Sequence, residues 1–213
     1  QPPQFKPVEK DDGPRADTSP ETLQRLKPAF DKTYGQVTAG NSSFMTDGGS
    51  AVLIMNMNRA KDLGYPPLAI YRDHLLHGTE PLDDVLLGPA YAIPLLLDRN
   101  KLKLSQIDVW EVHEAFASQV MAFRKCLASR KLCKDILGRD EAVGEIPLEK
   151  INTWGGSLSL GHPFGATGGR LLITAARRLQ EKGGRYAVVT GCAAGGHGSA
   201  MLLENPQAEL KLN

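Results

Sequence analysis

Two glycine-rich segments of the sequence each present one chemically reactive side chain. Residues 152–169 carry His162 between a glycine and a proline, and residues 191–198 carry Cys192 between two strand-like apolar runs. Glycines let a backbone approach a bound molecule closely and aim N–H groups at a developing negative charge. An imidazole and a thiol held in such turns are the groups that acyl chemistry on thioesters requires. We therefore expect an acyl-transfer site, or what remains of one.

His162 and His113 are the two histidines whose positions suggest catalysis. His162 stands just ahead of a predicted helix, where an imidazole tends to stay neutral and can donate a hydrogen bond to a carbonyl oxygen. His113 follows a predicted strand at 107–112, at the edge where α/β sheets usually bind ligands. A capping or packing role is the alternative for either histidine. The glycine run lacks the lysine of a phosphate-binding loop, so a nucleotide site is not expected.

Hydrophobic periodicity predicts strands that alternate with helices. Apolar runs predict strands at 68–72, 107–112, 186–190 and 199–203. Helical spacing predicts helices at 89–99, at 115–126 and after Gly168. This order indicates an α/β fold with a layered sheet. The helix after Gly168 is expected to expose the face opposite its apolar residues, namely Arg170, Arg177 and Arg178.

The composition is that of an ordinary globular protein and argues against several classes. The chain has 213 residues and a formal net charge of +1, so nucleic-acid binding has no electrostatic support. Its three cysteines make a poor disulfide framework, which favours a reducing compartment, and no metal site is expected. No apolar run reaches the roughly 18 residues that a membrane-spanning helix needs. Because the sequence begins with glutamine, we expect a processed product, a fragment or one piece of a larger assembly.

A basic cluster near the middle of the chain leaves two interpretations open. Its members are Arg124, Lys125, Arg130, Lys131 and Lys134. Such a cluster is most often a solvated face of the molecule. The alternative is contact with an anionic partner, a lipid head group or a coenzyme phosphate.

Three segments together resemble the thiolase family, specifically its C-terminal half. Residues 152–168 are similar to the family's histidine motif, and residues 192–196 are similar to its cysteine motif. Residues 113–116 resemble a third motif, which begins with asparagine in many thiolases. Its histidine version resembles the β-subunit type of the trifunctional complex of mitochondrial fatty-acid β-oxidation. The stretch 37–49 resembles the segment before the C-terminal domain, and the whole resemblance covers nearly all of residues 18–204.

The resemblance implies an acyltransferase that cleaves 3-ketoacyl-CoA with CoA to acetyl-CoA and a shortened acyl-CoA. CoA and acyl-CoA would be substrates, with no bound cofactor and no metal. By this resemblance Cys192 is the catalytic acid and base, which exchanges a proton with the incoming thiol and the acetyl carbanion. His162 would activate the nucleophilic cysteine and donate to a thioester oxyanion, and His113 would complete that oxyanion hole.

The resemblance also implies residues that bind the substrate. The backbone at Ala194 and Gly195 would contribute to a second oxyanion hole, and Phe116 would line the acyl pocket. A thiolase needs a second cysteine that becomes acylated, and the family carries it in the N-terminal half. Neither Cys126 nor Cys133 lies in a matching motif. We therefore expect this chain to supply one side of a divided site.

The fold implied by the resemblance is the layered αβαβα thiolase fold. This chain would supply its C-terminal domain and the last segment of its N-terminal domain. We expect residues 1–66 to form an extended arm and that closing segment, and residues 67–213 to form the C-terminal domain. Residues 48–57, which are small and apolar, should form an inner strand or helix that the missing half completes.

Two interpretations of the assembly follow from the resemblance. In the first, the chain is half of a split or cleaved thiolase and works with a chain that carries the nucleophilic cysteine, in a thiolase-type dimer or a larger complex. In the second, it is a catalytically inactive, thiolase-derived structural subunit of a larger mitochondrial assembly. Either implies the mitochondrial matrix or the inner membrane, with peripheral membrane association left open. A decarboxylating or condensing relative is disfavoured, because both site turns match thiolase.

Overall fold

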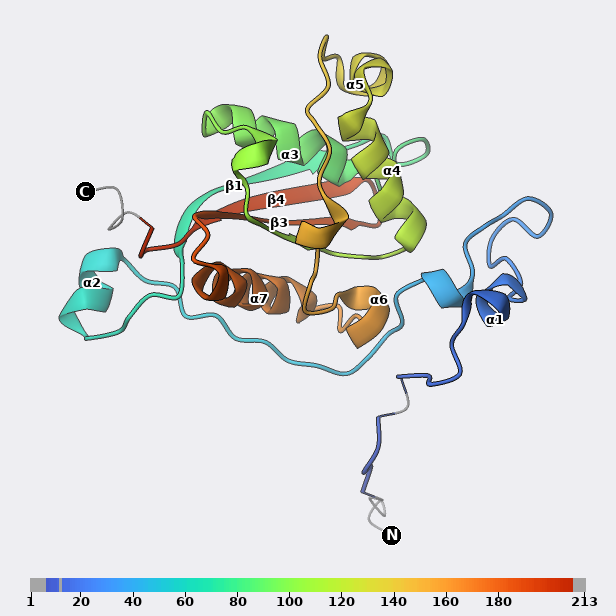
Figure 1. Cartoon of the computed structure of the whole chain (residues 1–213), viewed down its shortest axis with the longest axis horizontal. Helices are drawn as coiled ribbons and strands as arrows, with labels where there is room; N and C mark the ends of the chain where they lie inside the picture. The colour runs from blue at the N-terminus through green and yellow to red at the C-terminus, as the bar shows by residue number, and fades with distance from the viewer. Residues whose placement is uncertain (1–6, 12, 209–213) are drawn as a thin grey trace.

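The computed structural model describes residues 7–11 and 13–208, and a mixed β-sheet lies at its centre (Figure 1). Within these residues four strands lie in the order β1-β4-β3-β2. They are β1 (Ile70–Gly78), β2 (Val109–Val112), β3 (Tyr186–Ala193) and β4 (His197–Glu204). Strand β4 pairs antiparallel with both β1 and β3, whereas β2 pairs parallel with β3.

Helices cover both faces of this sheet, which confirms the predicted α/β class. Helices α3 (Gly88–Arg99) and α4 (Ala117–Ala128) lie on one face, with α5 (Arg130–Leu137) beyond them. Helix α7 (Thr167–Lys182) lies on the other face (Figure 1). The remaining α-helices of the described residues are short, namely α1 (Pro20–Gln24), α2 (Met57–Asp62) and α6 (Ser157–Leu160). Helix on sheet on helix makes three of the five layers expected for the complete fold.

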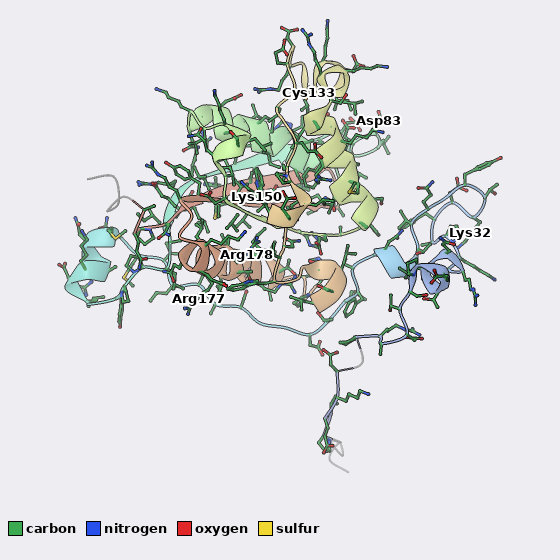
Figure 2. The ribbon with its side chains drawn as sticks, in the orientation of Figure 1. Lys32, Asp83, Cys133, Lys150, Arg177 and Arg178 are labelled. Carbon is green, nitrogen blue, oxygen red and sulfur yellow. The ribbon has the colours of Figure 1, made fainter. Side chains whose placement is uncertain are left out.

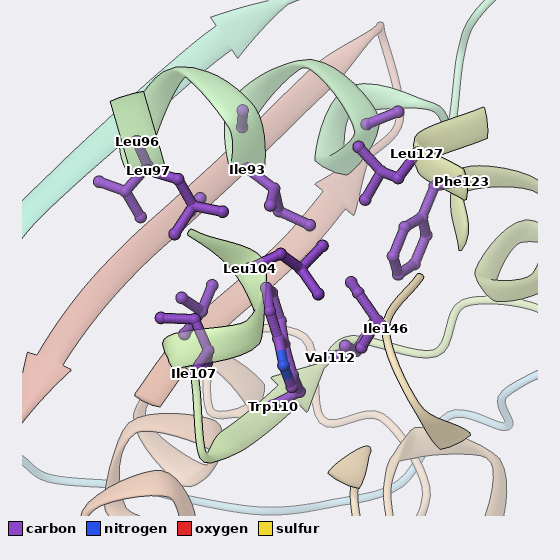
Figure 3. Close-up of a cluster of buried hydrophobic side chains, with 14 of the residues drawn as sticks. Ile93, Leu96, Leu97, Leu104, Ile107, Trp110, Val112, Phe123, Leu127 and Ile146 are labelled. Carbon is purple, nitrogen blue, oxygen red and sulfur yellow. The ribbon is translucent and has the colours of Figure 1, made fainter. Parts of the chain in front are cut away.

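The larger hydrophobic core lies between the sheet and helices α3 and α4 (Figure 3). Ile93 and Leu96 of α3, Trp110 of β2 and Phe123 of α4 are each 0% exposed. Apolar residues three or four positions apart share one helix face, which these helices turn toward the strands. Burying each such side chain contributes about 1.5–3 kcal/mol. This packing holds β2 in place, and His113 directly follows β2.

A second core forms where α7 packs on the opposite face of the sheet. Its members include Leu171, Ala175 and Leu179 of α7 and Val109, Ala187 and Leu203 of the sheet. Successive side chains of a strand point to opposite faces. In β3, accordingly, Val188 belongs to the core under α3, whereas its neighbours Ala187 and Val189 belong to the core under α7. Both faces of the sheet are therefore covered.

The expectation that Arg178 lies on the solvent face of α7 is wrong. Its side chain is 1% exposed and forms an ion pair with Glu111 of β2, which is 0% exposed. Arg178 also donates to the carbonyl of Trp110 at 3.0 Å and to the carbonyl of Lys150 at 2.9 Å. Figure 2 labels Arg178 below Lys150, with Arg177 beside it on the same helix. A buried guanidinium is tolerated here because a carboxylate and two carbonyls accept from it.

The two C-terminal strands extend further toward their connecting turn than their apolar runs predict. The expected strands at 186–190 and 199–203 become β3 and β4, which pair as far as Ala193 with His197. Cys192 therefore lies inside β3, opposite Gly198, and not in the turn itself. Backbone pairing, to which glycine contributes as well as any residue, extends beyond the apolar side chains that signal a strand.

The expected inner strand or helix at 48–57 is absent from the described structure, apart from Met57 at the start of α2. Residues 43–56 form neither helix nor strand and run along α7 (Figure 1). Ser50 ties them to that helix by donating to the carbonyl of Ala166 at 2.9 Å. Val52, Leu53 and Ile54 are 44%, 77% and 76% exposed. An extended segment becomes a strand only when another strand pairs with it, and here no described strand does.

The predicted basic cluster is not one continuous charged face. Arg124 is 6% exposed and donates to the carbonyl of Ile146 at 2.9 Å. Arg130 pairs with Glu141 at 3.0 Å on the surface. Three exposed lysines are left, and their exposure is compatible with both interpretations of the cluster.

Candidate active site

His113 lies directly after β2, at the carboxyl edge of the sheet. Its N–H donates to the carbonyl of Thr190 at 2.8 Å, so the pairing with β3 continues one residue beyond β2. A Cβ atom added at Gly191 would lie 3.2 Å from the Cβ of His113, which places these two residues side by side. Cys192 is the next residue of β3. The sheet therefore brings the predicted histidine and cysteine to the same edge.

His162 lies in a tight turn between α6 and α7. Gly161 before it has a φ of +87°, a conformation that side chains other than glycine rarely adopt. A Cβ atom there would also lie 2.2 Å from the side chain of Thr46. The His162 N–H donates to the carbonyl of Phe44 at 2.8 Å, and its Nδ1 lies 2.7 Å from Oγ1 of Thr167. These contacts hold the ring and leave Nε2 without a hydrogen-bond partner in the described part of the chain.

The two histidine rings are in contact. The ring centroids of His113 and His162 are 4.1 Å apart and the planes are inclined by 35°. Phe164 lies on His162 as well, with centroids 4.6 Å apart. Residues 49 positions apart in sequence could be predicted to share a site only by resemblance, whereas the fold places their rings against each other.

Both imidazoles are held in the neutral form. Burial, then repulsion from a protonated His162 and from Arg170, lowers the pKa of His113 to about 4. Burial and the charge of Arg170 also lower the pKa of His162. A neutral imidazole can donate from one nitrogen and accept at the other. At neutral pH the pair can therefore both stabilise a negative oxygen and remove a proton.

Cys192 is a buried thiol next to an open turn. It is 7% exposed, and burial raises its pKa to about 11. The turn continues through Ala194 and Gly195, which are exposed, so their backbone can be reached from solvent. Gly195 and Gly196 have φ of +87° and +77°. Gly196 also leaves no room for a side chain, because a Cβ atom would lie 2.5 Å from the carbonyl oxygen of Thr79.

Phe116 begins α4 as its N-cap residue and is half-buried. Its ring meets the ring of Phe30 edge-on, with centroids 6.1 Å apart. A backbone bridge joins it to Ser42, so this residue fastens the N-terminal segment to the C-terminal one. Its expected place in the acyl pocket stays a prediction.

A hydrogen-bond network around Asn152 joins the end of β2 to the His162 segment, and sequence reasoning assigned it no role. The Asn152 amide accepts from the N–H of Val112 at 2.7 Å and donates to the carbonyl of Val112 at 2.8 Å. It also donates to Glu114 at 2.7 Å, and Glu114 accepts from the N–H of Leu158 at 3.1 Å. Asn152 adopts a φ of 43°, which asparagine tolerates better than most residues. The clue available from sequence was that Asn152 stands inside the motif at 152–168 and Glu114 inside the motif at 113–116.

An open hollow of about 690 Å³ borders His162, and its lining also includes Phe44 and Phe164. Among the described residues, no group of three or more histidine, cysteine or acidic side chains could hold a metal ion. In that same part of the chain, no helix is both long and apolar enough to cross a membrane. All three cysteines are free.

The chain matches known proteins along most of its length. Residues 65–205 match the family model for the thiolase C-terminal domain, and residues 2–58 match that for the thiolase N-terminal domain. The mitochondrial trifunctional enzyme subunit beta of Rattus norvegicus is 53% identical over 197 residues, which are 92% of this chain and 41% of that protein. The 3-ketoacyl-CoA thiolase of Photobacterium profundum is 46% identical over 92% of this chain and 45% of its own length.

A solved structure, that of human mitochondrial 3-ketoacyl-CoA thiolase in complex with CoA, superimposes with a TM-score of 0.74 at 34% identity. The similarity covers 92% of this chain and 45% of the human one. The chain therefore spans less than half the length of the relatives it matches.

Proposed function

The chain belongs to the thiolase family, and from that premise we propose that it is the C-terminal half of a 3-ketoacyl-CoA thiolase. The reaction is thiolytic cleavage of a 3-ketoacyl-CoA by CoA to acetyl-CoA and a shortened acyl-CoA in fatty-acid β-oxidation. The observation that carries the proposal is the contact of two neutral imidazoles, His113 and His162, at the sheet edge that also holds Cys192.

Cys192 acts as the acid and then as the base in this proposal. Because burial raises its pKa to about 11, it is a thiol at neutral pH and can donate its proton. When the carbon–carbon bond of the 3-ketoacyl group breaks, the proton passes to the acetyl-CoA carbanion and leaves a thiolate. That thiolate takes the proton from the incoming CoA thiol, which attacks the acyl group now held as a thioester on the nucleophilic cysteine. The bond from the acyl carbon to that cysteine breaks, and the released sulfur regains its proton from His162. Cys192 thus ends the cycle in its starting form.

His162 and His113 act on the acyl side of the reaction. His162 accepts a proton on Nε2 from the nucleophilic cysteine, because Thr167 already holds its Nδ1. Both rings then donate to the oxygen that becomes negative. The backbone at Ala194 and Gly195 provides a second such donor site, and loss of one donor lowers rate by about 10²–10³.

The nucleophilic cysteine must come from another polypeptide segment. Cys126 and Cys133 are 1% and 0% exposed and pack between α4 and α5, so neither thiol can reach a substrate. We propose a partner chain with the N-terminal thiolase half, in a thiolase-type dimer or a larger complex. The exposed, unpaired segment Val52–Ile54 supports this, since a strand of the partner could cover it.

The proposed division places residues 1–66 with that other half and residues 67–213 in the C-terminal domain. Its support is that every strand of the described sheet lies after Pro67, while residues 43–56 pair with none of these strands. The proposed location is the mitochondrion, in the matrix or at the inner membrane, by analogy with the mitochondrial relative.

The test is acetyl-CoA release from a 3-ketoacyl-CoA by natively isolated protein, before and after His162→Ala. Loss of a positioned base should reduce turnover by about 10²–10⁴. His74→Ala is the matched control, because His74 is exposed on β1, at the sheet edge opposite β2. Mass spectrometry of the same material should find a stoichiometric companion with a cysteine in a thiolase N-terminal motif.

Two results would overturn the proposal. Unchanged turnover of His162→Ala would remove this histidine from the mechanism. If no pairing of the chain with its companions cleaves a 3-ketoacyl-CoA, the chain is instead a catalytically inactive, thiolase-derived structural subunit.

A further inference from the structure

Ser157 lies between a charged side chain and the His113 ring. It is the first residue of α6 and is 0% exposed. Its Oγ accepts a hydrogen bond from Nη2 of Arg170 at 3.1 Å and lies 3.0 Å from Nδ1 of His113. These are the two partners of this hydroxyl among the described residues. The sequence motifs gave Ser157 and Arg170 no role in the chemistry.

The chemistry of these three groups determines where the hydrogens lie. A guanidinium has donors and no acceptor, so the Ser157 oxygen accepts in its contact with Arg170. The hydroxyl hydrogen then has one acceptor within reach, Nδ1 of His113. A buried hydroxyl left without an acceptor is unfavourable, so the hydrogen points to that nitrogen. In a neutral imidazole, a nitrogen that accepts leaves the ring proton on the other nitrogen.

We propose that Ser157, oriented by Arg170, is a positioning residue that holds His113 as its Nε2–H tautomer, the form that donates to a substrate oxygen. Arg170 is itself fixed, because its Nη1 donates to the carbonyl of Gly161 at 2.9 Å. The same guanidinium therefore connects the turn that holds His162 with the hydroxyl that orients His113. The catalytic meaning of this tautomer rests on the proposed thiolase function, whereas the tautomer itself does not.

Neutrality of His113 makes the choice of tautomer matter. Burial and the charges of His162 and Arg170 lower the pKa of His113 to about 4, so near pH 7 the ring carries one proton. With that proton on Nδ1, the Nε2 lone pair would face the substrate oxygen and repel it. With the proton on Nε2, the ring donates. Ser157 thus selects the tautomer of His113 that attracts the substrate oxygen over the tautomer that repels it.

The experiment is nitrogen NMR of the assembled protein with ¹⁵N-labelled histidine, because shifts of ring nitrogens distinguish the two tautomers. Ser157→Ala removes the hydroxyl, and Ser157→Thr retains one. Ser159→Ala is the matched control on the same short helix, since, among the described residues, the backbone of Gly156 is the only hydrogen-bond partner of its exposed hydroxyl. His113→Gln assigns the His113 signals by their disappearance.

We expect His113 to be the Nε2–H tautomer in the unaltered protein, in Ser157→Thr and in Ser159→Ala, and a mixture of tautomers in Ser157→Ala. In Ser157→Ala, kcat for thiolysis should fall about tenfold with little change in KM, less than the roughly 10²–10³ lost with a whole oxyanion donor. A dominant Nδ1–H form, or an unchanged tautomer in Ser157→Ala, would overturn the proposal. The expected tautomers without any thiolysis would refute the proposed function and support the assignment of the proton.

Discussion

Acid should destabilise this protein through His113, and the size of the effect follows from its burial. The His113 pKa is lowered from 6.5 to about 4 in the folded chain, first by burial and then by the charges of His162 and Arg170. Below pH 6.5 the unfolded state therefore binds a proton that the folded state resists, so stability falls as pH falls. Each pKa unit corresponds to about 1.36 kcal/mol. Relative to its value well above pH 6.5, the free energy of unfolding falls by about 2 kcal/mol at pH 5 and about 3 kcal/mol near pH 4.

The measurement is urea unfolding between pH 8 and pH 4, followed by the fluorescence of tryptophan. Trp110 is 0% exposed, so its emission changes when the core opens. Other groups also titrate in this range, and the comparison with His113→Asn isolates the contribution of one ring. The difference in free energy of unfolding between the variant and the parent should grow in favour of the variant as pH falls. His74→Asn serves as the control, because His74 is exposed on β1.

A flat difference between parent and His113→Asn across this pH range would refute the reasoning. It would mean that the imidazole protonates as readily in the folded chain as in the unfolded one. The lowered pKa that supports the neutral histidine pair of the proposed mechanism would then be wrong as well.

Two substitutions should destabilise the elements that position the site. Arg178→Met leaves the Glu111 carboxylate buried without its cation and should lower the free energy of unfolding by about 3–5 kcal/mol, whereas Arg177→Met should change it little. Asn152→Asp places a second carboxylate against Glu114 and removes an amide donor, so a loss of about 3 kcal/mol is expected in urea unfolding. Asn58→Asp, at an exposed position, is its control. If Arg178→Met or Asn152→Asp lowers the free energy of unfolding no more than its control does, the argument for that residue is contradicted.

Much of the fold could be predicted because its signals are local. Residues 89–99 and 115–126 show helical spacing, and they became α3 and α4 close to their predicted limits. The strand at 186–190 was predicted from its apolar run. In each case the periodicity reflects a face that must be buried, and residues close together in the sequence form that face. The motifs around His162, Cys192 and His113 likewise made the family recognisable from sequence.

Tertiary structure decided which polar groups meet, because burying a polar side chain is costly unless the fold brings it a partner. Arg178 has the spacing of a solvent-facing residue and is buried, since β2 places Glu111 opposite it. Residues 48–57 are small and apolar, which predicted an inner strand or helix, yet in the described part of the chain no strand pairs with them, and an extended segment becomes a strand only beside another strand. The sequence alone determined that an imidazole and a thiol stand in glycine-rich segments. Only the fold decided that His162 rests on His113 and that Ser157 reaches its Nδ1, since those contacts join residues more than 40 positions apart.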